Sequence, residues 1–261
     1  MNRIIVFALM FFCMTMQIEA QTLSEEEVTA KMYQAFELNK AAKKAEALEL
    51  FLIVGENTKQ QRNEGERQVY VCSQTMACQC YELLGRYKEG YLLGKSLLQG
   101  KLNDTERKDV GHLYAMNGYM YACEFIQRDE KGRADYKRGR ELISEILPYS
   151  DGQVKEYAET KIPLSWYFEG AQYAMTQSYD EALSSYEEAL NGFRDLGRVS
   201  EEVDVLSGIA SVKAHLCKFD EAKRVYYQAF VLAHQNGKVN KQMDVLRELW
   251  SLGNSTGDMI R

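Results

Sequence analysis

Apolar and small residues recur every three or four positions along most of this chain. Two neighbouring triplets share the spacing i, i+4, i+7: Trp166, Gly170 and Tyr173, then Ala182, Tyr186 and Ala189. That spacing places each triplet along one face of an α-helix. Because only a short polar stretch separates them, the two helices are expected to fold back on each other as an antiparallel hairpin.

The two smallest residues of these triplets predict where the helices cross. Gly170 and Ala182 would let the helix axes approach to roughly 8–10 Å. The rings of Trp166, Tyr173 and Tyr186 would fill the space on either side of that contact. A hairpin with one close crossing is therefore the unit to look for elsewhere in the chain.

The same unit recurs along the sequence. A small residue marks each second helix at intervals of about forty to fifty residues: Ala47, Gly90, Gly139, Ala182 and Ala222. The expected hairpins cover 24–62, 65–103, 104–150, 152–196 and 198–237, and a lone helix covers 240–252. The residues expected to build the repeats are Ala47, Phe51, Gly90, Tyr114, Gly118, Tyr121, Gly139, Trp166, Gly170, Tyr173, Ala182, Tyr186, Ala189, Ala222, Tyr226 and Ala229. Ser24 and Glu27 predict a capping box at the start of the first helix.

These motifs resemble the tetratricopeptide repeat (TPR), whose pattern is Trp-x2-Leu-Gly-x2-Tyr followed by Ala-x3-Phe-x2-Ala. Glu169 stands where that family has Leu, and Arg194 where it has a closing Pro. The resemblance implies an all-α, right-handed α-solenoid of antiparallel hairpins with a period of about 40. It also implies a concave face lined by the first helix of each hairpin. The long period is more similar to bacterial exported regulators and sensor ectodomains than to eukaryotic co-chaperones.

The helix at 240–252 allows two interpretations. It is either a cap that closes the stack or the first half of another repeat. Trp250 occupies the position at which Gly118, Gly170 and Ala210 are small. A Trp there would keep a following helix from approaching closely, which favours the cap.

The first twenty residues have the pattern of a secretory signal peptide. Arg3 precedes an apolar run from Ile4 to Met16, and Ile18-Glu19-Ala20 forms a cleavage site before Gln21. The run is shorter than the roughly 20 residues that span a bilayer, so cleavage is favoured over an uncleaved anchor. The mature domain, 21–261, is therefore expected not to span a membrane. Export points to the periplasm or cell envelope of a Gram-negative bacterium.

Charge and cysteine usage narrow the chemistry. The formal net charge is −6, so no strongly basic face is expected and nucleic acid is a poor partner. The mature part keeps an odd number of cysteines, Cys72, Cys78, Cys80, Cys123 and Cys217, which leaves at least one unpaired. Most are interpreted as packing thiols, with one opportunistic disulfide as the alternative.

No catalytic or metal-binding constellation stands out. His112, His215 and His234 are scattered and lack an i, i+4 partner for a metal. No cofactor is implied and an enzyme is not expected. The resemblance places six candidate binding residues on the concave face: Thr75, Gln79, Tyr119, Tyr167, Ser211 and His215. The Lys and Asn with which some family members clamp a terminal carboxylate are missing from that register, so a peptide with a free acidic end is not the expected ligand.

Three functional hypotheses remain. The leading one is an exported scaffold that binds an unidentified protein or peptide on its concave face. The alternative is a sensory or regulatory ectodomain of an envelope signalling system, although no membrane helix or output domain is evident in these 261 residues. A glycan-binding module is disfavoured, because Cys13 follows Phe12 where a lipoprotein site needs a small residue.

Overall fold

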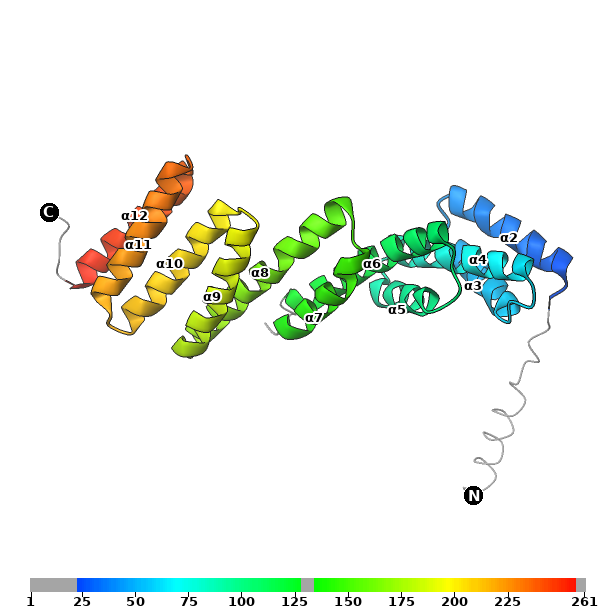
Figure 1. The fold of residues 1–261 in the computed structure, drawn as a ribbon, viewed down its shortest axis with the longest axis horizontal. Helices are drawn as coiled ribbons and strands as arrows, with labels where there is room; N and C mark the ends of the chain where they lie inside the picture. Colours follow the sequence, from blue (N-terminus) through cyan, green and yellow to red (C-terminus); the bar gives the residue numbers. More distant parts are fainter. Residues whose placement is uncertain (1–22, 128–133, 257–261) are drawn as a thin grey trace, which may run out of the picture. The chain divides into compact units, whose positions relative to one another are not determined.

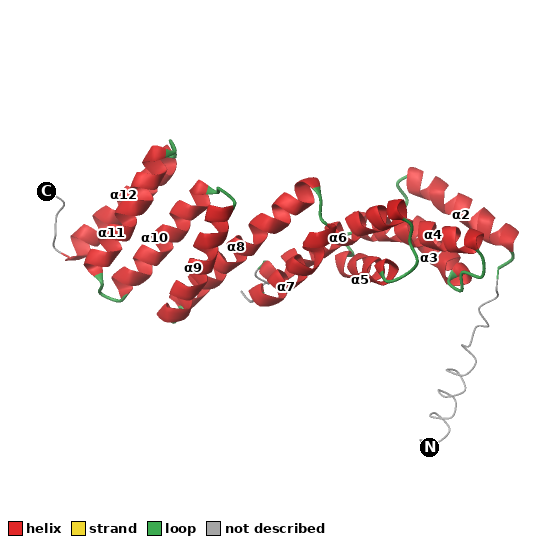
Figure 2. Ribbon diagram, in the orientation of Figure 1, coloured by secondary structure: helices red, strands yellow, loops and turns green. Residues whose placement is uncertain are grey.

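The computed structural model describes residues 23–127 and 134–256, and within these ranges the chain is helical and contains no strand (Figure 2). The expected all-α fold of antiparallel helix hairpins is confirmed. The chain divides into two compact units, residues 1–113 and 114–261. The predicted signal peptide lies outside the described residues. None of the described helices is long and apolar enough to cross a membrane.

The first unit contains two complete hairpins. Its helices are α2 (Glu25–Lys40), α3 (Lys44–Thr58), α4 (Glu64–Leu83) and α5 (Tyr87–Leu98). The long helix α6 (Asp104–Ile126) begins in this unit and continues into the second. Each pair, α2 with α3 and α4 with α5, is joined by a short turn (Figure 1).

The second unit continues the series from α6. Its further elements are α7 (Tyr136–Ile146), a short 3-10 helix (Leu147–Tyr149), α8 (Gly152–Met175), α9 (Tyr179–Asp195), α10 (Val199–His215), α11 (Phe219–Gln235) and α12 (Val239–Thr256). Helices α8 to α12 follow one another in space as they do in sequence (Figure 1). The last helix begins one residue earlier than expected and runs four residues further.

Helices α8 and α9 come close at the two small residues. A methyl group built on Gly170 would lie 2.9 Å from Cδ1 of Tyr186 and 3.2 Å from the carbonyl oxygen of Ala182. Gly139 marks a similar crossing, because a methyl group there would lie 3.3 Å from the carbonyl oxygen of Ala122 in α6. Any larger side chain at these positions would push the helices apart.

One turn type joins most of the helices. Among the described residues, six connections place a residue at a φ between 59° and 71°: Ala42 (61°), Gly85 (71°), Gln177 (62°), Gly197 (64°), Cys217 (59°) and Gly237 (64°). After each of them the next N–H donates to a carbonyl five residues back, as Ser178 does to Tyr173 at 2.9 Å. This is the Schellman motif, which ends a helix and reverses the chain. Glycine takes that conformation freely, whereas Ala42, Gln177 and Cys217 take it under strain.

Side-chain caps begin the first helices of the first unit. Ser24 and Glu27 form the predicted capping box, and Asn103 and Glu106 form another with both hydrogen bonds at 2.9 Å. Glu106 also pairs with Arg67 of α4 at 2.8 Å. Hydrogen bonds from Arg67 lower the pKa of the Glu106 carboxyl, so this contact between α4 and α6 stays charged at neutral pH.

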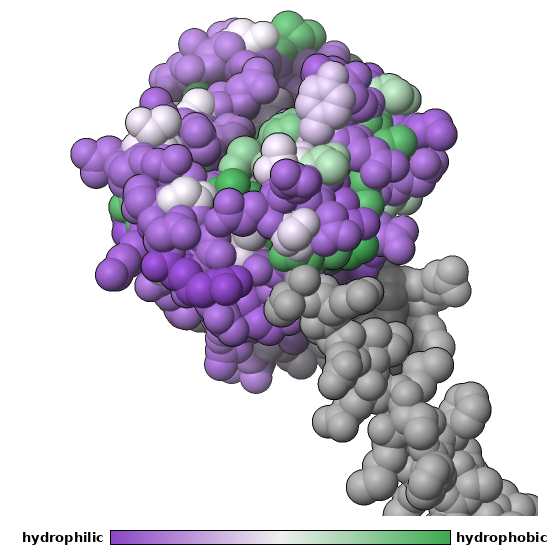
Figure 3. All heavy atoms as spheres, turned by 90° about the vertical axis from the view of Figure 1, so that its right-hand side faces the viewer, coloured by the Kyte–Doolittle hydropathy of each residue, from purple (hydrophilic) through white to green (hydrophobic). Residues whose placement is uncertain are grey.

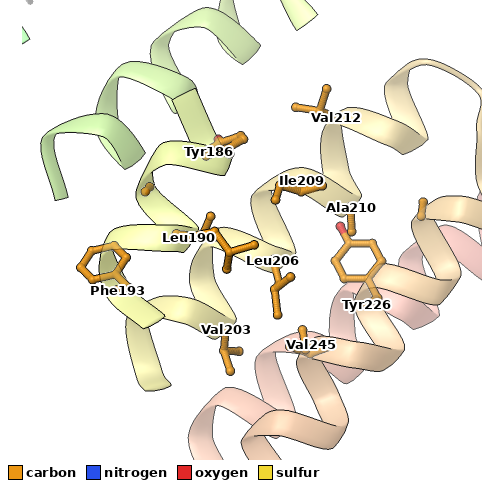
Figure 4. Packing of buried hydrophobic residues seen from close by; sticks show 14 of the residues in the cluster. Tyr186, Leu190, Phe193, Val203, Leu206, Ile209, Ala210, Val212, Tyr226 and Val245 are labelled. Atoms are coloured by element: carbon orange, nitrogen blue, oxygen red, sulfur yellow. The ribbon is translucent and has the colours of Figure 1, made fainter. Parts of the chain in front are cut away.

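Each unit has its own apolar core. In the first, Phe51 of α3 packs against Phe36 of α2 edge to face at 5.5 Å and belongs to the same core cluster as the buried Ala77 and Tyr81 of α4. The face drawn in Figure 3 is mostly hydrophilic, with apolar side chains gathered in a band across its middle. In the second unit, Figure 4 shows α9 and α10 packing through Leu190 and Leu206, with Ala210 of α10 pointing toward Tyr226 of α11.

Overpacking the α8–α9 crossing tests its role. Ala182→Leu should lower the free energy of unfolding by about 1–3 kcal/mol, because the buried Ala182 has no room for a larger side chain. The exposed Glu188→Gln on the same helix should change it little. Chemical denaturation of both variants provides the measurement, and equal losses would place the crossing elsewhere.

The strained turns make the opposite prediction. Gln177→Gly should stabilise the protein by about 1 kcal/mol, since glycine adopts the positive φ of 62° without a steric penalty. Gly197→Ala, at an equivalent turn with φ of 64°, should destabilise it by a similar amount. Urea unfolding curves of the two variants should shift in opposite directions. Shifts of the same sign would contradict the strain argument.

Candidate interaction face

Helix α8 carries a line of large apolar side chains that reaches solvent. Tyr157, Phe168 and Met175 are 52%, 38% and 75% exposed. They are separated by eleven and seven residues, a spacing that keeps them on one side of the helix. Single exposed apolar residues are common, but an aligned group of this kind is typical of a binding surface.

Tyr119 of α6 joins this line through Tyr157. Their rings stack with centroids 6.3 Å apart and planes 27° from parallel. Burial and a hydrogen bond with Cys123 raise the pKa of the Tyr119 hydroxyl well above its usual value, so it stays neutral. The positive charge of Lys161 lies near the buried Cys123 thiol. Tyr119 is half-buried, so part of its ring remains at the surface.

Tyr167 lies on the neighbouring side of α8, toward the next hairpins. Its ring packs against Tyr186 of α9 at 5.8 Å and against Phe168 at 5.7 Å. Burial, with a smaller contribution from the Asp204 carboxylate, raises the pKa of the Tyr167 hydroxyl. The ammonium group of Lys241 in α12 donates to the carboxylate of Asp204 in α10 at 2.5 Å. This ion pair joins α10 and α12, the two helices after α8 that stand first in their repeats. We define the first-helix face of the second unit by these residues: Tyr119, Tyr157, Lys161, Tyr167, Phe168, Met175, Asp204 and Lys241.

The four polar candidates from the sequence have mostly internal partners. Thr75 and Gln79 lie half-buried on α4 in the first unit, and the Thr75 hydroxyl donates to the Val71 carbonyl at 2.7 Å. Ser211 hydrogen-bonds with Tyr226 of α11. His215 is exposed at the end of α10, where its ring stacks on Tyr179 at 5.9 Å. The structure thus places Tyr119 and Tyr167 on the first-helix face of the second unit and Thr75 and Gln79 in the first unit.

Sequence reasoning missed three of the most exposed side chains on this face. Tyr157, Phe168 and Met175 do not belong to the repeat motif, so the motif does not point to them. A second apolar line along α8, continued through the half-buried Leu164, was the available signal.

The repeat residues serve packing. All of those named from the sequence are buried except Tyr121, Trp166 and Tyr173, which are half-buried. Since they lie between helices, they build the scaffold and leave binding to other positions.

Glu169, the departure from the TPR pattern, has a structural partner. Arg140 of α7 donates to its carboxylate at 2.8 Å and to the Ser165 hydroxyl at 3.3 Å. The guanidinium carbon also lies 3.4 Å from the centre of the Trp166 ring, a cation–π contact. Arg140 is 9% exposed, so its charge depends on these contacts. The acid at 169 therefore belongs to an interior charge cluster between α7 and α8.

Two hollows of the first unit are lined by side chains with structural roles. An open hollow of about 500 Å³ lies between α3 and α4, where Tyr70 faces Glu56 and Lys59, two side chains that already pair with each other. A second, of about 560 Å³, lies beside Ser24 and Asn63, whose side chains cap α2 and α4. Within the described ranges, no three His, Cys, Asp or Glu side chains gather as a metal site.

Within the described ranges, Cys72, Cys78, Cys80, Cys123 and Cys217 form no disulfide with one another. Cys78, Cys80 and Cys123 are buried, whereas Cys72 and Cys217 are exposed. Burial raises the pKa of the Cys78 thiol to about 12, which makes it a poor nucleophile at neutral pH. The burial of Cys78, Cys80 and Cys123 agrees with a packing role for these three thiols.

Comparison with known proteins finds likeness in structure. No protein-family model matches the sequence, and no curated protein matches it. The TPR protein TTC0263 from Thermus thermophilus is 17% identical, with 86% of this chain and 98% of that protein covered and a TM-score of 0.32. A kinesin light chain protein from Podosopora anserina, whose TPR-like repeats are nearly identical to one another, is 14% identical to this chain. The match covers 81% of this chain and 97% of that protein, with a TM-score of 0.33. BtubC from P. vanneervenii is 11% identical, covering 88% and 85%, with a TM-score of 0.36. The assignment of the fold rests on this chain's own hairpins.

The charge cluster at Glu169 generates a test of the departure from the TPR pattern. Glu169→Leu restores the residue of that pattern but leaves the buried Arg140 without its carboxylate, so stability should fall by about 3–5 kcal/mol. The double variant Arg140→Met, Glu169→Leu removes both charges and should recover most of the loss. Thermal and urea unfolding measure both variants. A single variant as stable as the parent would mean that Arg140 finds its charge compensation elsewhere.

Proposed function

We propose that this chain is an exported, non-catalytic interaction scaffold that binds a protein or peptide partner on the first-helix face of its second unit. The observation that carries the proposal is the line of exposed apolar side chains on α8. Tyr157, Phe168 and Met175 are large apolar side chains that lie in line on one side of the helix and are exposed to solvent, which is typical of an interaction site.

The support beneath this line favours binding over mere exposure. Tyr157 is held by its stack on Tyr119, and Phe168 by its contact with Tyr167, which is itself packed on Tyr186. Rings fixed in this way lose little conformational entropy when a partner covers them. Met175 adds a flexible thioether that adapts to different apolar surfaces.

The chemistry of the face indicates the kind of partner. Two rings and a thioether would take an apolar or amphipathic peptide segment, with Lys161 available for a carboxylate at one side. The net charge of −6 and the lack of a basic stripe in the described ranges argue against nucleic acid. The N-terminal pattern of residues 1–20 supports export to the cell envelope as part of the same proposal.

Site-specific photo-crosslinking in the native cell envelope tests this proposal. A photoreactive phenylalanine at position 157 or 168 should crosslink a discrete partner, whereas the same residue at Tyr227, which is 64% exposed on the second-position helix α11, should not. The triple change Tyr157→Ser, Phe168→Ser, Met175→Ser should reduce copurification of that partner at least tenfold with little change in melting temperature. Tyr227→Ser is the matched control.

Two results would count against the proposal. Equal crosslinking from 157, 168 and 227 would mean non-specific contact. Copurification that survives the triple change would place the binding surface on other helices.

A further inference from the structure

Helices α3 and α4 of the first unit form the walls of the open hollow of about 500 Å³. On the α3 side, Leu52 and Ile53 supply half-buried apolar side chains. On the α4 side, Tyr70 supplies a hydroxyl and Gln74 a carboxamide. The volume is within the range of sites that hold small organic molecules, so the polar groups of the wall decide which molecule would fit.

Gln74 is the most buried polar side chain of this hollow, with 6% of its surface exposed. It stands four residues before Cys78, the small residue of its helix, a position that Tyr114 and Trp166 hold in later hairpins. A carboxamide therefore replaces a ring at this repeat position. The amide fits only because position 55 has no side chain, since a methyl group built on Gly55 would lie 1.7 Å from Nε2 of Gln74.

Only one end of the Gln74 carboxamide has a partner. Its nitrogen Nε2 donates to the backbone carbonyl of Phe51 at 3.4 Å. Because only the nitrogen end of an amide can donate, this hydrogen bond turns the oxygen Oε1 away from Phe51. Among the described residues Oε1 accepts no hydrogen bond, and it is not sealed from solvent, so it opens into the hollow. A nearly buried acceptor without a donor costs free energy, which a ligand with a donor would recover.

The charges around the hollow favour a cation. The ion pair between Glu56 and Lys59 gives those two side chains a structural role and neutralises the positive charge of Lys59. Glu49 is exposed on α3, and within the described part of the chain its carboxylate forms no ion pair or hydrogen bond. Burial raises the pKa of the Tyr70 hydroxyl, so this group stays neutral. The hollow therefore has an excess of acceptors and a net negative charge.

This chemistry selects an organic cation from the possible ligands. An anion would meet the carboxylates of Glu49 and Glu56. A wholly apolar molecule would leave the oxygen of Gln74 unsatisfied. A protonated amine supplies three N–H donors and a positive charge, and an apolar stem behind it would pack on Leu52 and Ile53.

We propose that the hollow between α3 and α4 binds a protonated alkylamine, whose ammonium group donates to Oε1 of Gln74 and lies beside the carboxylate of Glu49. Free alkylamines and the lysine side chain of a peptide share this chemistry. The hollow is lined by the second-position helix α3 as well as by α4, so it is distinct from a surface made of first-position helices. It lies in the first unit and does not depend on the partner binding proposed for α8.

Methyl NMR of the purified protein tests the proposal with n-butylammonium, 1-butanol and butyrate, which have similar size but different charge. Butylammonium should shift the methyl signals of Leu52 and Ile53 until they saturate, whereas the alcohol and the anion should not at the same concentrations. A short capped peptide with one lysine then separates the two sources. Tighter binding of the peptide than of butylammonium supports the site as a lysine pocket, and weaker binding supports it as a site for free amines.

Three variants locate the ammonium group. Gln74→Met keeps the length of the side chain and removes the oxygen, so butylammonium binding should weaken roughly tenfold or more. Glu49→Gln removes an exposed charge that has no described partner and should weaken binding roughly two- to fivefold. Glu46→Gln, an exposed position on the same helix outside the hollow, is the matched control and should leave the dissociation constant unchanged.

The proposal is overturned if butylammonium does not bind, or if the alcohol and the anion shift the same signals equally. It is also overturned if binding is unchanged in a Gln74→Met protein whose urea unfolding curve matches the parent. Should Gln74→Met fail to fold, Glu49→Gln decides the matter, because it changes only a surface side chain. Unchanged binding in that variant would place the ammonium group elsewhere.

Discussion

The close approach of two helices at a small residue is the contact on which the second unit depends. At Gly170 the backbone of α8 lies against Tyr186 of α9, and at Gly208 the backbone of α10 lies against the same ring, with methyl groups at these positions 2.9 and 2.8 Å from it. Tyr186 thus packs within its own hairpin and against the next. Because a single hairpin buries too little apolar surface to be stable alone, a side chain shared between neighbours makes the stability of each hairpin depend on the other.

The turns impose a second constraint, and three of them satisfy it only with a strained backbone. A Schellman turn reverses direction in three residues and keeps consecutive helices antiparallel, which the close crossings require. Gly85, Gly197 and Gly237 satisfy it freely, whereas Ala42, Gln177 and Cys217 adopt the same positive φ with a side chain present. The packing of the flanking helices is strong enough to hold these residues in a disfavoured conformation.

Regular packing leaves two surfaces unused, and both follow from the same geometry. A first-position helix contacts its own partner helix on one side and the next hairpin on another, so the remaining side of α8 carries Tyr157, Phe168 and Met175 without any role in the core. Helix α12 stands in the first position without a described partner helix, so the side that would face that helix carries Met243 and Trp250 to solvent. The first surface consists of rings held in place by neighbouring rings, and the second consists of exposed apolar side chains along one side of a single helix.

The sequence by itself determined the helices and their order, because periodicity at three and four residues and the small residues near Gly170 and Ala182 are local properties. It also located the capping box at Ser24, whose hydrogen bonds span only three residues. It did not determine the surroundings of individual side chains. Glu169 was only an unexplained departure from the TPR pattern until Arg140, 29 residues earlier, was found beside it. In the same way, the sequence suggested Tyr119 and Tyr167 for the binding face, and their packing on Tyr157 and Tyr186 emerged only from the fold. Exposure depends on which helices pack against a given side, and that is decided by contacts between residues far apart in the chain.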